Sequence, residues 1–303
     1  MNNGRDKAII AIVNGAAGGG RCLDAARDAI ASLRLRNAIN VFQTRSPGHA
    51  TELAREHFEA GHRRFISVGG DGTTFEVING LFPSAAADGE RVELGILPLG
   101  TGNSFLRDFG ITSQARAIDA LERWETQPVD VVRADHDEGV IHYVNLLGLG
   151  FTAEVGELTN RRFKGLGAAG YVAAVVSSLA NLQAPLDPIR LDDEETDVRP
   201  AVFLSFSNSQ YTGGAMHMAP GASLTDGLLD VVRVGEMSRA TLISTFPKIY
   251  SGAHVEHPQV EVHRARRVEF LESRKQAVMV DGEIMHLALR SLEVLKGAVE
   301  VVR

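Results

Sequence analysis

A repeated unit in the first 110 residues limits the possible folds more than any other feature: a short β-rich run, a turn and a helical stretch. Apolar runs at residues 8–13, 38–44, 64–68 and 93–97 have the length of buried strands. Helical spacing occupies residues 23–35, 49–60, 74–81 and 104–109, with Ser46 as a candidate N-cap of the second helix. Strands that alternate with helices predict a parallel sheet covered by helices on both faces. In such sheets ligands bind in the loops at the carboxyl ends of the strands.

The pattern changes near Pro128, where strand signals begin to dominate. They cover residues 129–133, 140–147, 201–208, 228–234, 260–263, 267–271, 276–280 and 292–295, with helical stretches at 165–182 and 238–251. At 303 residues the chain has the length of about two domains. We therefore predict a doubly wound α/β domain at 1–128 and a β-sandwich domain with an inserted helix at 129–303. Whether the last residues pack back on the first domain is left open.

The third predicted strand runs into a glycine-rich loop. Its sequence is Gly69-Gly70-Asp71-Gly72-Thr73, and a helical stretch follows it. Glycines let backbone N–H groups approach an anion closely, and the helix behind adds a positive end. Asp71 would repel a bare phosphate, which indicates that it acts through a cation. A tight Asp-Gly turn is the plainer alternative.

Two further strands end in similar loops. The fourth strand enters Pro98-Leu99-Gly100-Thr101-Gly102-Asn103, and the first ends at Asn14 before a run of small residues. Asn103 or Ser104 could serve only as a helix N-cap. Three such loops after three strands nevertheless favour a single nucleotide lying across one edge of the sheet.

The second half contains two acidic turns. Asp226 precedes one strand, and Asp281 and Glu283 flank a glycine at the tip of a predicted hairpin. Asp-Gly between apolar runs is also the usual sequence of a plain hairpin turn, and that alternative stays open. If both carboxylates face one cleft, Glu283 can accept a proton from an attacking hydroxyl, with its pKa tuned by burial and by Asp281.

With these motifs together, the chain resembles the diacylglycerol kinase catalytic-domain family, which includes sphingosine, ceramide and bacterial lipid kinases. The resemblance rests on the ordered segments 69–73, 98–103, 148–155, 219–231 and 280–283. It implies a cleft between a nucleotide domain and a lipid domain, and transfer of the γ-phosphoryl group of ATP to a lipid hydroxyl. By matched position, it implies that Asn14, Thr44, Gly69 to Thr73 and Gly100 to Asn103 contact ATP. It further implies that Glu283 is the general base beside Asp281 and Asp71, and that Asp226 with the carbonyls of Ser223 and Leu228 holds a structural Mg²⁺. A second Mg²⁺ would accompany the phosphates.

Two positions depart from the family pattern. Asn14 is followed by glycine instead of proline, and Ser104 stands where an aspartate is common. These departures leave the lipid acceptor open. An NAD kinase-like phosphotransferase and a non-catalytic nucleotide or lipid sensor remain the alternatives.

Charge and composition limit the partners. The net charge of −7 argues against nucleic-acid binding, which requires a basic face. A single cysteine, Cys22, favours a cytoplasmic protein. We expect a lipid substrate presented at a membrane and peripheral contact with the bilayer, for which Arg161, Arg162 and Lys164 are candidates, and we leave a homodimer open.

Overall fold

The architecture comes from a computed structural model, which describes residues 8–15, 22–35, 37–82, 84–85, 89, 91–100, 103–151, 153, 155 and 184–303. The chain divides into two compact units. The first comprises residues 1–131 together with 295–303, and the second comprises residues 132–294. The predicted helix at 165–182 and the basic residues Arg161, Arg162 and Lys164 lie outside the described residues.

The first unit contains a parallel sheet in the order β2-β1-β3-β4, and the end of the last strand of the chain pairs with β4. The strands are β1 (Ile9–Val13), β2 (Ile39–Gln43), β3 (Arg64–Gly69), β4 (Glu93–Pro98) and the long β17 (Leu289–Val302). Every residue of β1 is buried, as its continuous apolar sequence requires for a central parallel strand. In register, Val13 lies beside Val68 and Gly69 beside Pro98, so β1, β3 and β4 end at the same edge of the sheet.

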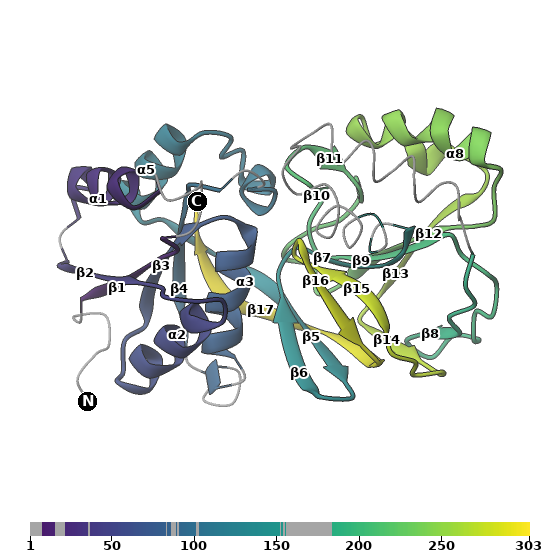
Figure 1. The fold of residues 1–303 in the computed structure, drawn as a ribbon, viewed down its shortest axis with the longest axis horizontal. Coiled ribbons are helices and arrows are strands. Elements are labelled where there is room, and N and C mark those ends of the chain that lie inside the picture. The colour runs from purple at the N-terminus through teal and green to yellow at the C-terminus, as the bar shows by residue number, and fades with distance from the viewer. Residues whose placement is uncertain are drawn as a thin grey trace. The chain divides into compact units, whose positions relative to one another are not determined.

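Helices cover both faces of this sheet, α1 and α5 on one and α2 and α3 on the other (Figure 1). Their bounds are α1 (Cys22–Ser32), α2 (His49–Glu59), α3 (Asp71–Leu81) and α5 (Gln114–Arg123), with a 3₁₀ helix η3 at Phe105–Phe109. The candidate Ser46 does not cap α2, because the helix begins after Gly48, whose φ of 83° suits glycine. The carboxylate of Glu76 on α3 accepts the N–H groups of Gly48 and Ala50 at 3.0 Å each, which replaces the missing serine cap.

The second unit is built on two sets of strands. One is a six-stranded sheet in the order β13-β12-β9-β7-β15-β16. Its strands are β7 (Leu146–Gly150), β9 (Phe203–Ser207), β12 (Leu229–Val234), β13 (Val260–Ala265), β15 (Gln276–Val280) and β16 (Glu283–Leu287). The other set pairs β6 (Gly139–Tyr143) with the end of β5 (Thr126–His136), and β14 (Arg267–Phe270) with β8 (Ile189–Leu191) and the start of β17.

The single strand predicted at 140–147 is wrong, and the reason is structural. Residues up to Tyr143 pair with β5, whereas residues from Leu146 pair with β9 in the six-stranded sheet. The chain therefore leaves one set of strands and joins the other at Val144 and Asn145. The sequence gives no sign of such a crossing, because Tyr143 and Leu146, on either side of it, are both buried apolar residues.

Apolar packing holds the two sets of strands together. The rings of Phe206 on β9 and Phe270 on β14 meet edge to face, with centroids 5.5 Å apart. Tyr143, fully buried, donates its hydroxyl to the carbonyl of Phe206 at 3.0 Å. The observed fold is thus an α/β domain followed by a β-sandwich domain, as the sequence predicts.

The second unit also carries a short hairpin and a helical segment. The hairpin is β10 (Tyr211–Thr212) with β11 (Met216–His217), and the segment is α8 (Arg239–Thr245) followed by the 3₁₀ helices η6 (Phe246–Tyr250) and η7 (Ala253–Glu256). Residues of α8 and η6 fall within the predicted helical stretch at 238–251, and Ser238 caps α8 by accepting the N–H of Thr241 at 3.1 Å.

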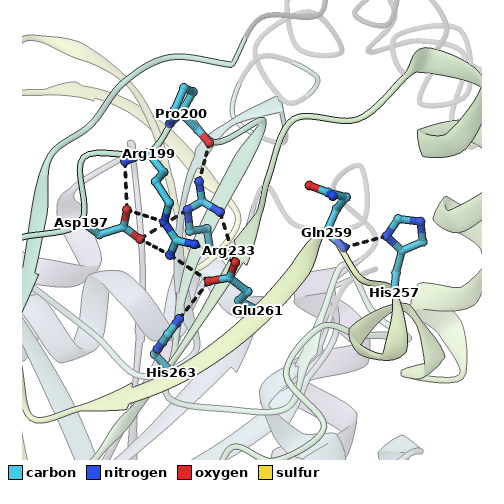
Figure 2. A network of polar contacts seen from close by, with 8 residues as sticks. All are labelled: Asp197, Arg199, Pro200, Arg233, His257, Gln259, Glu261 and His263. Carbon is cyan, nitrogen blue, oxygen red and sulfur yellow. Dashed lines mark hydrogen bonds and ion pairs between the residues drawn. The ribbon is translucent and has the colours of Figure 1, made fainter.

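A network of ion pairs fastens the loop before β9 to the six-stranded sheet (Figure 2). Arg199 donates to Asp197 at 2.7 Å and to Glu261 at 2.8 Å. Arg233, which is only 6% exposed, donates to the carbonyl of Pro200 at 2.6 Å. Because this buried guanidinium also faces Asp197 and Glu261 at 3.5 and 3.7 Å, its charge is compensated on two sides.

Candidate functional site

The loops after β1, β3 and β4 meet at one edge of the first unit. The backbone N–H of Asn14 donates to the carbonyl of Val68 at 3.0 Å, and its side-chain amide donates to the hydroxyl of Thr73 at 3.2 Å. Gly100 donates its N–H to the carbonyl of Gly69 at 3.0 Å. Thr44, at the end of β2, donates its N–H to the carbonyl of Val13 at 2.9 Å. The structure thus brings together most of the residues that the sequence assigned to a nucleotide, while Thr101 and Gly102 lie outside the described residues.

The loops after β3 and β4 approach each other so closely that only glycine fits. A Cβ built on Gly100 would lie 2.6 Å from the Cα of Gly70, closer than real side chains come to backbone atoms. A Cβ on Gly69 would lie 2.3 Å from the hydroxyl oxygen of Thr73. Gly100 is therefore required for the contact between the two loops, and Gly69 makes room for the side chain of Thr73 within its own loop.

The motif Asp71-Gly72-Thr73 forms the first turn of α3 and is not a loop that precedes it. The helix predicted to start at residue 74 therefore begins earlier, at Asp71. The positive end of the 11-residue helix thus lies within the glycine-rich motif. Such a helix start, beside glycines, favours an anion such as a phosphate group.

Asp71 joins the two loops in a way that sequence reasoning missed. Its Oδ2 accepts the backbone N–H of Ser104 at 2.9 Å, which places its carboxylate at the start of η3. Ser104 stands at the N-cap position of η3 and makes no side-chain cap bond, while its own N–H is satisfied by the aspartate of the neighbouring loop. Burial raises the pKa of Asp71, and hydrogen bonds from Ser104 and Phe105 oppose that rise.

Asn103 shapes the second loop. Its backbone φ is 44°, in the left-handed region that asparagine tolerates better than most residues. Its side-chain amide donates to the carbonyl of Gly100 at 2.7 Å. Asn103 is thus a structural residue of this loop, in addition to any contact with a ligand.

In the second unit, Asp281 and Gly282 form the two-residue turn between β15 and β16. Their φ values of 48° and 90° fit a tight hairpin turn. Asp281 is only 3% exposed, and its carboxylate accepts three backbone N–H groups at 3.0 Å each, those of Val144, Asn145 and Leu146. These are the amides of the crossing between β6 and β7, so Asp281 provides the hydrogen bonds that the crossing removes from the ladders.

The charge of Asp281 affects the neighbouring side chain of Tyr143. Burial raises the pKa of Tyr143 well above the usual value for tyrosine, and the Asp281 carboxylate raises it further. The phenol is therefore neutral and acts as a hydrogen-bond donor. Both carboxylate oxygens of Asp281 are engaged by the backbone, which makes it a positioning residue.

Glu283, by contrast, is exposed at the first position of β16. Asp281 and Glu283 lie in different environments, because the Asp281 carboxylate is buried against backbone amides and the Glu283 side chain is exposed to solvent. The turn glycine between the two residues changes the direction of the chain, so that Glu283 starts the next strand on its way out of the turn. Among the carboxylates of this turn, only Glu283 is accessible to a substrate.

In the acidic turn at Asp226, the carboxylate forms an ion pair with an arginine of the same chain. Asp226 accepts the N–H of Leu228 on one oxygen at 3.0 Å, and its other oxygen pairs with the guanidinium of Arg264. Arg264 also donates to Asp230 at 3.1 Å. Ser223 hydrogen-bonds Thr225 at 3.4 Å.

A carboxylate with two backbone carbonyls is a suitable set of oxygen ligands for Mg²⁺. Here, however, the guanidinium of Arg264 lies on the Asp226 oxygen where the cation would bind. The residues therefore do not fit a magnesium ion in this arrangement.

An apolar cavity of about 60 Å³ lies in the second unit against the six-stranded sheet. Its lining residues are Phe151, Val202, Phe203, Met218, Val234, Met237, Leu242, Thr245, Phe246, Ile249, His254 and Val260. Burial lowers the pKa of His254, whose ring nitrogen hydrogen-bonds the carbonyl of Met218 at 3.0 Å. A neutral histidine and apolar walls suit a hydrocarbon group better than a charged one.

Comparisons with known proteins cover almost the whole chain. Residues 8–134 match the family described as the diacylglycerol kinase catalytic domain, and residues 145–303 match the YegS C-terminal NAD kinase beta sandwich-like domain. A diacylglycerol kinase of Mycobacterium tuberculosis is 30% identical over 97% of this chain and 94% of its own length. A probable YegS-like lipid kinase of Chromohalobacter salexigens is 34% identical over 78% of this chain and 74% of its own.

A solved structure supports the same relationship. A putative diacylglycerol kinase from Bacillus anthracis aligns with a TM-score of 0.72 at 27% identity, covering 98% of this chain and 97% of that one. In the part of this chain that the structure describes, no helix has the length and apolar character needed to cross a bilayer.

Proposed function

The chain belongs to the diacylglycerol kinase family, a family of kinases, and we propose that it transfers the γ-phosphoryl group of ATP to a lipid hydroxyl. The observation that carries the proposal is the contact between the glycine loops after β3 and β4. These loops keep two stretches of backbone together beside the start of α3, where no side chain intervenes. Backbone N–H groups at a helix start are a common way of binding nucleotide phosphates.

The nucleotide site of this proposal consists of the residues at this edge of the sheet. The glycine-loop amides and the helix start take the phosphates, and Thr44 offers a hydroxyl from the end of β2. The buried Thr73 hydroxyl accepts the amide of Asn14 and so joins the first and third loops. Asp71 fixes the second loop through Ser104 and so sets the distance between the two loops. Magnesium accompanies the ATP as the counter-ion of its phosphates, and in phosphoryl transfer it neutralises the charge that develops there.

The apolar cavity of the second unit supports a lipid acceptor. Its walls carry aliphatic, aromatic and thioether side chains, and its volume of about 60 Å³ has room for a few methylene groups of an acyl chain. A soluble ribose acceptor is polar and would gain nothing from apolar walls. Diacylglycerol and sphingoid bases both satisfy this chemistry.

Glu283 is the proposed general base. The lipid hydroxyl gives its proton to the Glu283 carboxylate, its oxygen forms a bond to the γ-phosphorus, and the bond to the β–γ bridging oxygen breaks to release ADP. The transition state of phosphoryl transfer is loose, so the protein contributes mainly placement and charge stabilisation. Asp281 supports this role indirectly, because it anchors the turn from which Glu283 extends.

The test is a kinase assay on the full chain with γ-labelled ATP and Mg²⁺. Separate reactions contain diacylglycerol or sphingosine in mixed micelles, or NAD in solution. We expect a labelled lipid and no labelled NAD. Label transferred to NAD alone would overturn the proposal.

Glu283→Gln tests the base assignment, with Glu272→Gln as the control because Glu272 is another exposed glutamate of the second unit. Loss of a general base lowers the rate by about 100-fold or more. We expect that loss for Glu283→Gln and a normal rate for Glu272→Gln. A normal rate of the Glu283 variant at saturating substrate would remove the assignment.

A further inference from the structure

The helical segment of residues 238–251 has two apolar faces. Toward the interior, Leu242, Phe246 and Ile249 line the apolar cavity. Toward solvent, Ile243 is 57% exposed and Tyr250 is 56% exposed, and Pro247 between them is exposed as well. A water-soluble surface helix usually places polar residues on its outer face.

The exposed apolar residues fall on one stripe. Ile243, Pro247 and Tyr250 are four and three residues apart, the spacing of neighbours on a helical surface. In Figure 1 the α8 segment forms an outer margin of the second unit. The spacing therefore favours one stripe along the segment over a set of scattered residues.

The charges of the segment are of one sign. Arg239 and Lys248 are its only charged side chains, both are exposed, and neither makes an ion pair with any residue that the structure describes. The whole chain carries a net charge of −7, so this segment is basic against an acidic background. Cations beside an apolar stripe complement an anionic lipid surface.

We propose that the α8–η6 surface, defined by Arg239, Ile243, Pro247, Lys248 and Tyr250, docks the enzyme on an anionic membrane. The inference rests on the proposed function, since it supplies the route by which a lipid in a bilayer reaches the cavity behind the same segment. Ile243 enters the acyl boundary, Tyr250 lies at the headgroup level as tyrosines commonly do, and the two cations contact lipid phosphates.

A second copy of the chain is the competing occupant, and the composition of the surface argues against it. Lysine is depleted in protein–protein interfaces, whereas this stripe has Lys248 beside Pro247. Two equal basic surfaces would also repel each other across a symmetric contact. A bilayer that contains anionic lipid avoids both difficulties.

Co-sedimentation of the full chain with vesicles tests the proposal. One set contains phosphatidylglycerol and phosphatidylcholine, and the other contains phosphatidylcholine alone. The double variant Ile243→Ser/Tyr250→Ser should bind both sets about tenfold more weakly or worse, because two half-exposed apolar side chains lose their burial in the membrane. Arg239→Gln/Lys248→Gln should lose the preference for anionic vesicles. The matched control is Leu271→Ser, which removes an apolar side chain that is 46% exposed elsewhere in the second unit.

The outcomes separate this inference from the proposed function. If the double variant folds, phosphorylates lipid in detergent micelles and sediments with vesicles like the wild type, the docking surface is overturned. It is equally overturned if the wild type is a dimer without vesicles and the double variant a monomer. If the wild type phosphorylates no lipid while the double variant still loses vesicle binding, the kinase proposal fails and the docking surface stands.

Discussion

Replacing Asp281 by asparagine separates the anchoring role of this residue from the chemistry of its neighbour Glu283. In the best orientation of the substituted amide, the remaining oxygen still accepts the N–H groups of Asn145 and Leu146. The amide nitrogen then faces the N–H of Val144, so that one hydrogen bond is lost and two donors oppose each other. A hydrogen bond to a charged group contributes about 1.5–3 kcal/mol, roughly twice a neutral one. Losing one such bond and the charge on two others should lower the free energy of unfolding by about 4 kcal/mol.

The assay is urea denaturation of the full chain followed by circular dichroism, together with thermal melting. For a unit of this size about 4 kcal/mol corresponds to a fall in Tm of roughly 10 °C. The matched change is Glu283→Gln, whose exposed side chain should leave the unfolding free energy within about 0.5 kcal/mol of the wild type. The anchoring argument would be refuted if Asp281→Asn unfolded like the wild type, since an acceptor of three buried N–H groups cannot be removed without cost.

Other contacts can be tested one at a time. Gly100→Ala should weaken ATP binding measured by calorimetry and destabilise the first unit by about 1–3 kcal/mol, because its Cβ would meet Gly70 at 2.6 Å; unchanged affinity would contradict the close-contact argument. Burial lowers the pKa of His142 from 6.5 to about 4, so the unfolded chain takes up the proton first as the pH falls. The free energy of unfolding should therefore drop by about 2 kcal/mol between pH 7 and 5, and His142→Gln should flatten that part of the profile. Arg199 holds the pKa of Glu261 below its usual 4.5, so this ion pair stabilises the fold above that pH and is lost as the pH falls further. Arg199→Gln should remove this acidic step from the unfolding profile, and an unchanged profile would show that the exposed pair contributes nothing.

The succession of elements could be read from the sequence because it depends on local periodicity. The predicted runs at 8–13, 64–68 and 93–97 correspond to β1, β3 and β4 with bounds that differ by a single residue at most at either end. The hairpin at Asp281 and Gly282 is equally clear from the sequence, because Asp-Gly between apolar runs is typical of such a turn. The structure confirms it, since both residues have a positive φ. Continuous apolar runs with glycine turns are sufficient to predict a parallel sheet and to place its loops at one edge, whereas the order β2-β1-β3-β4 comes from the structure.

The candidate site could be read only in part. The glycine loops after β1, β3 and β4 meet as the parallel order demands, but the bond from Ser104 to Asp71 joins residues 33 positions apart and leaves no trace in either motif. Likewise Arg264 on β13 pairs with Asp226, which precedes the neighbouring strand β12. This ion pair puts a guanidinium at the carboxylate that was expected to bind a metal ion. Such contacts depend on strand register, which composition alone does not specify.

The residues near Asp281 show which features of this protein depend on local sequence and which depend on long-range packing. Hydrophobic period and turn residues act over a few neighbours, so the bare sequence was enough to define a doubly wound first domain, a β-rich second domain and an acidic turn between two apolar strands. Nothing local indicates that Val144 and Asn145 cross between two sets of strands, or that Asp281, which lies 136 residues after Asn145, accepts their N–H groups. A buried N–H must find an acceptor, and which acceptor is near depends on how distant segments pack.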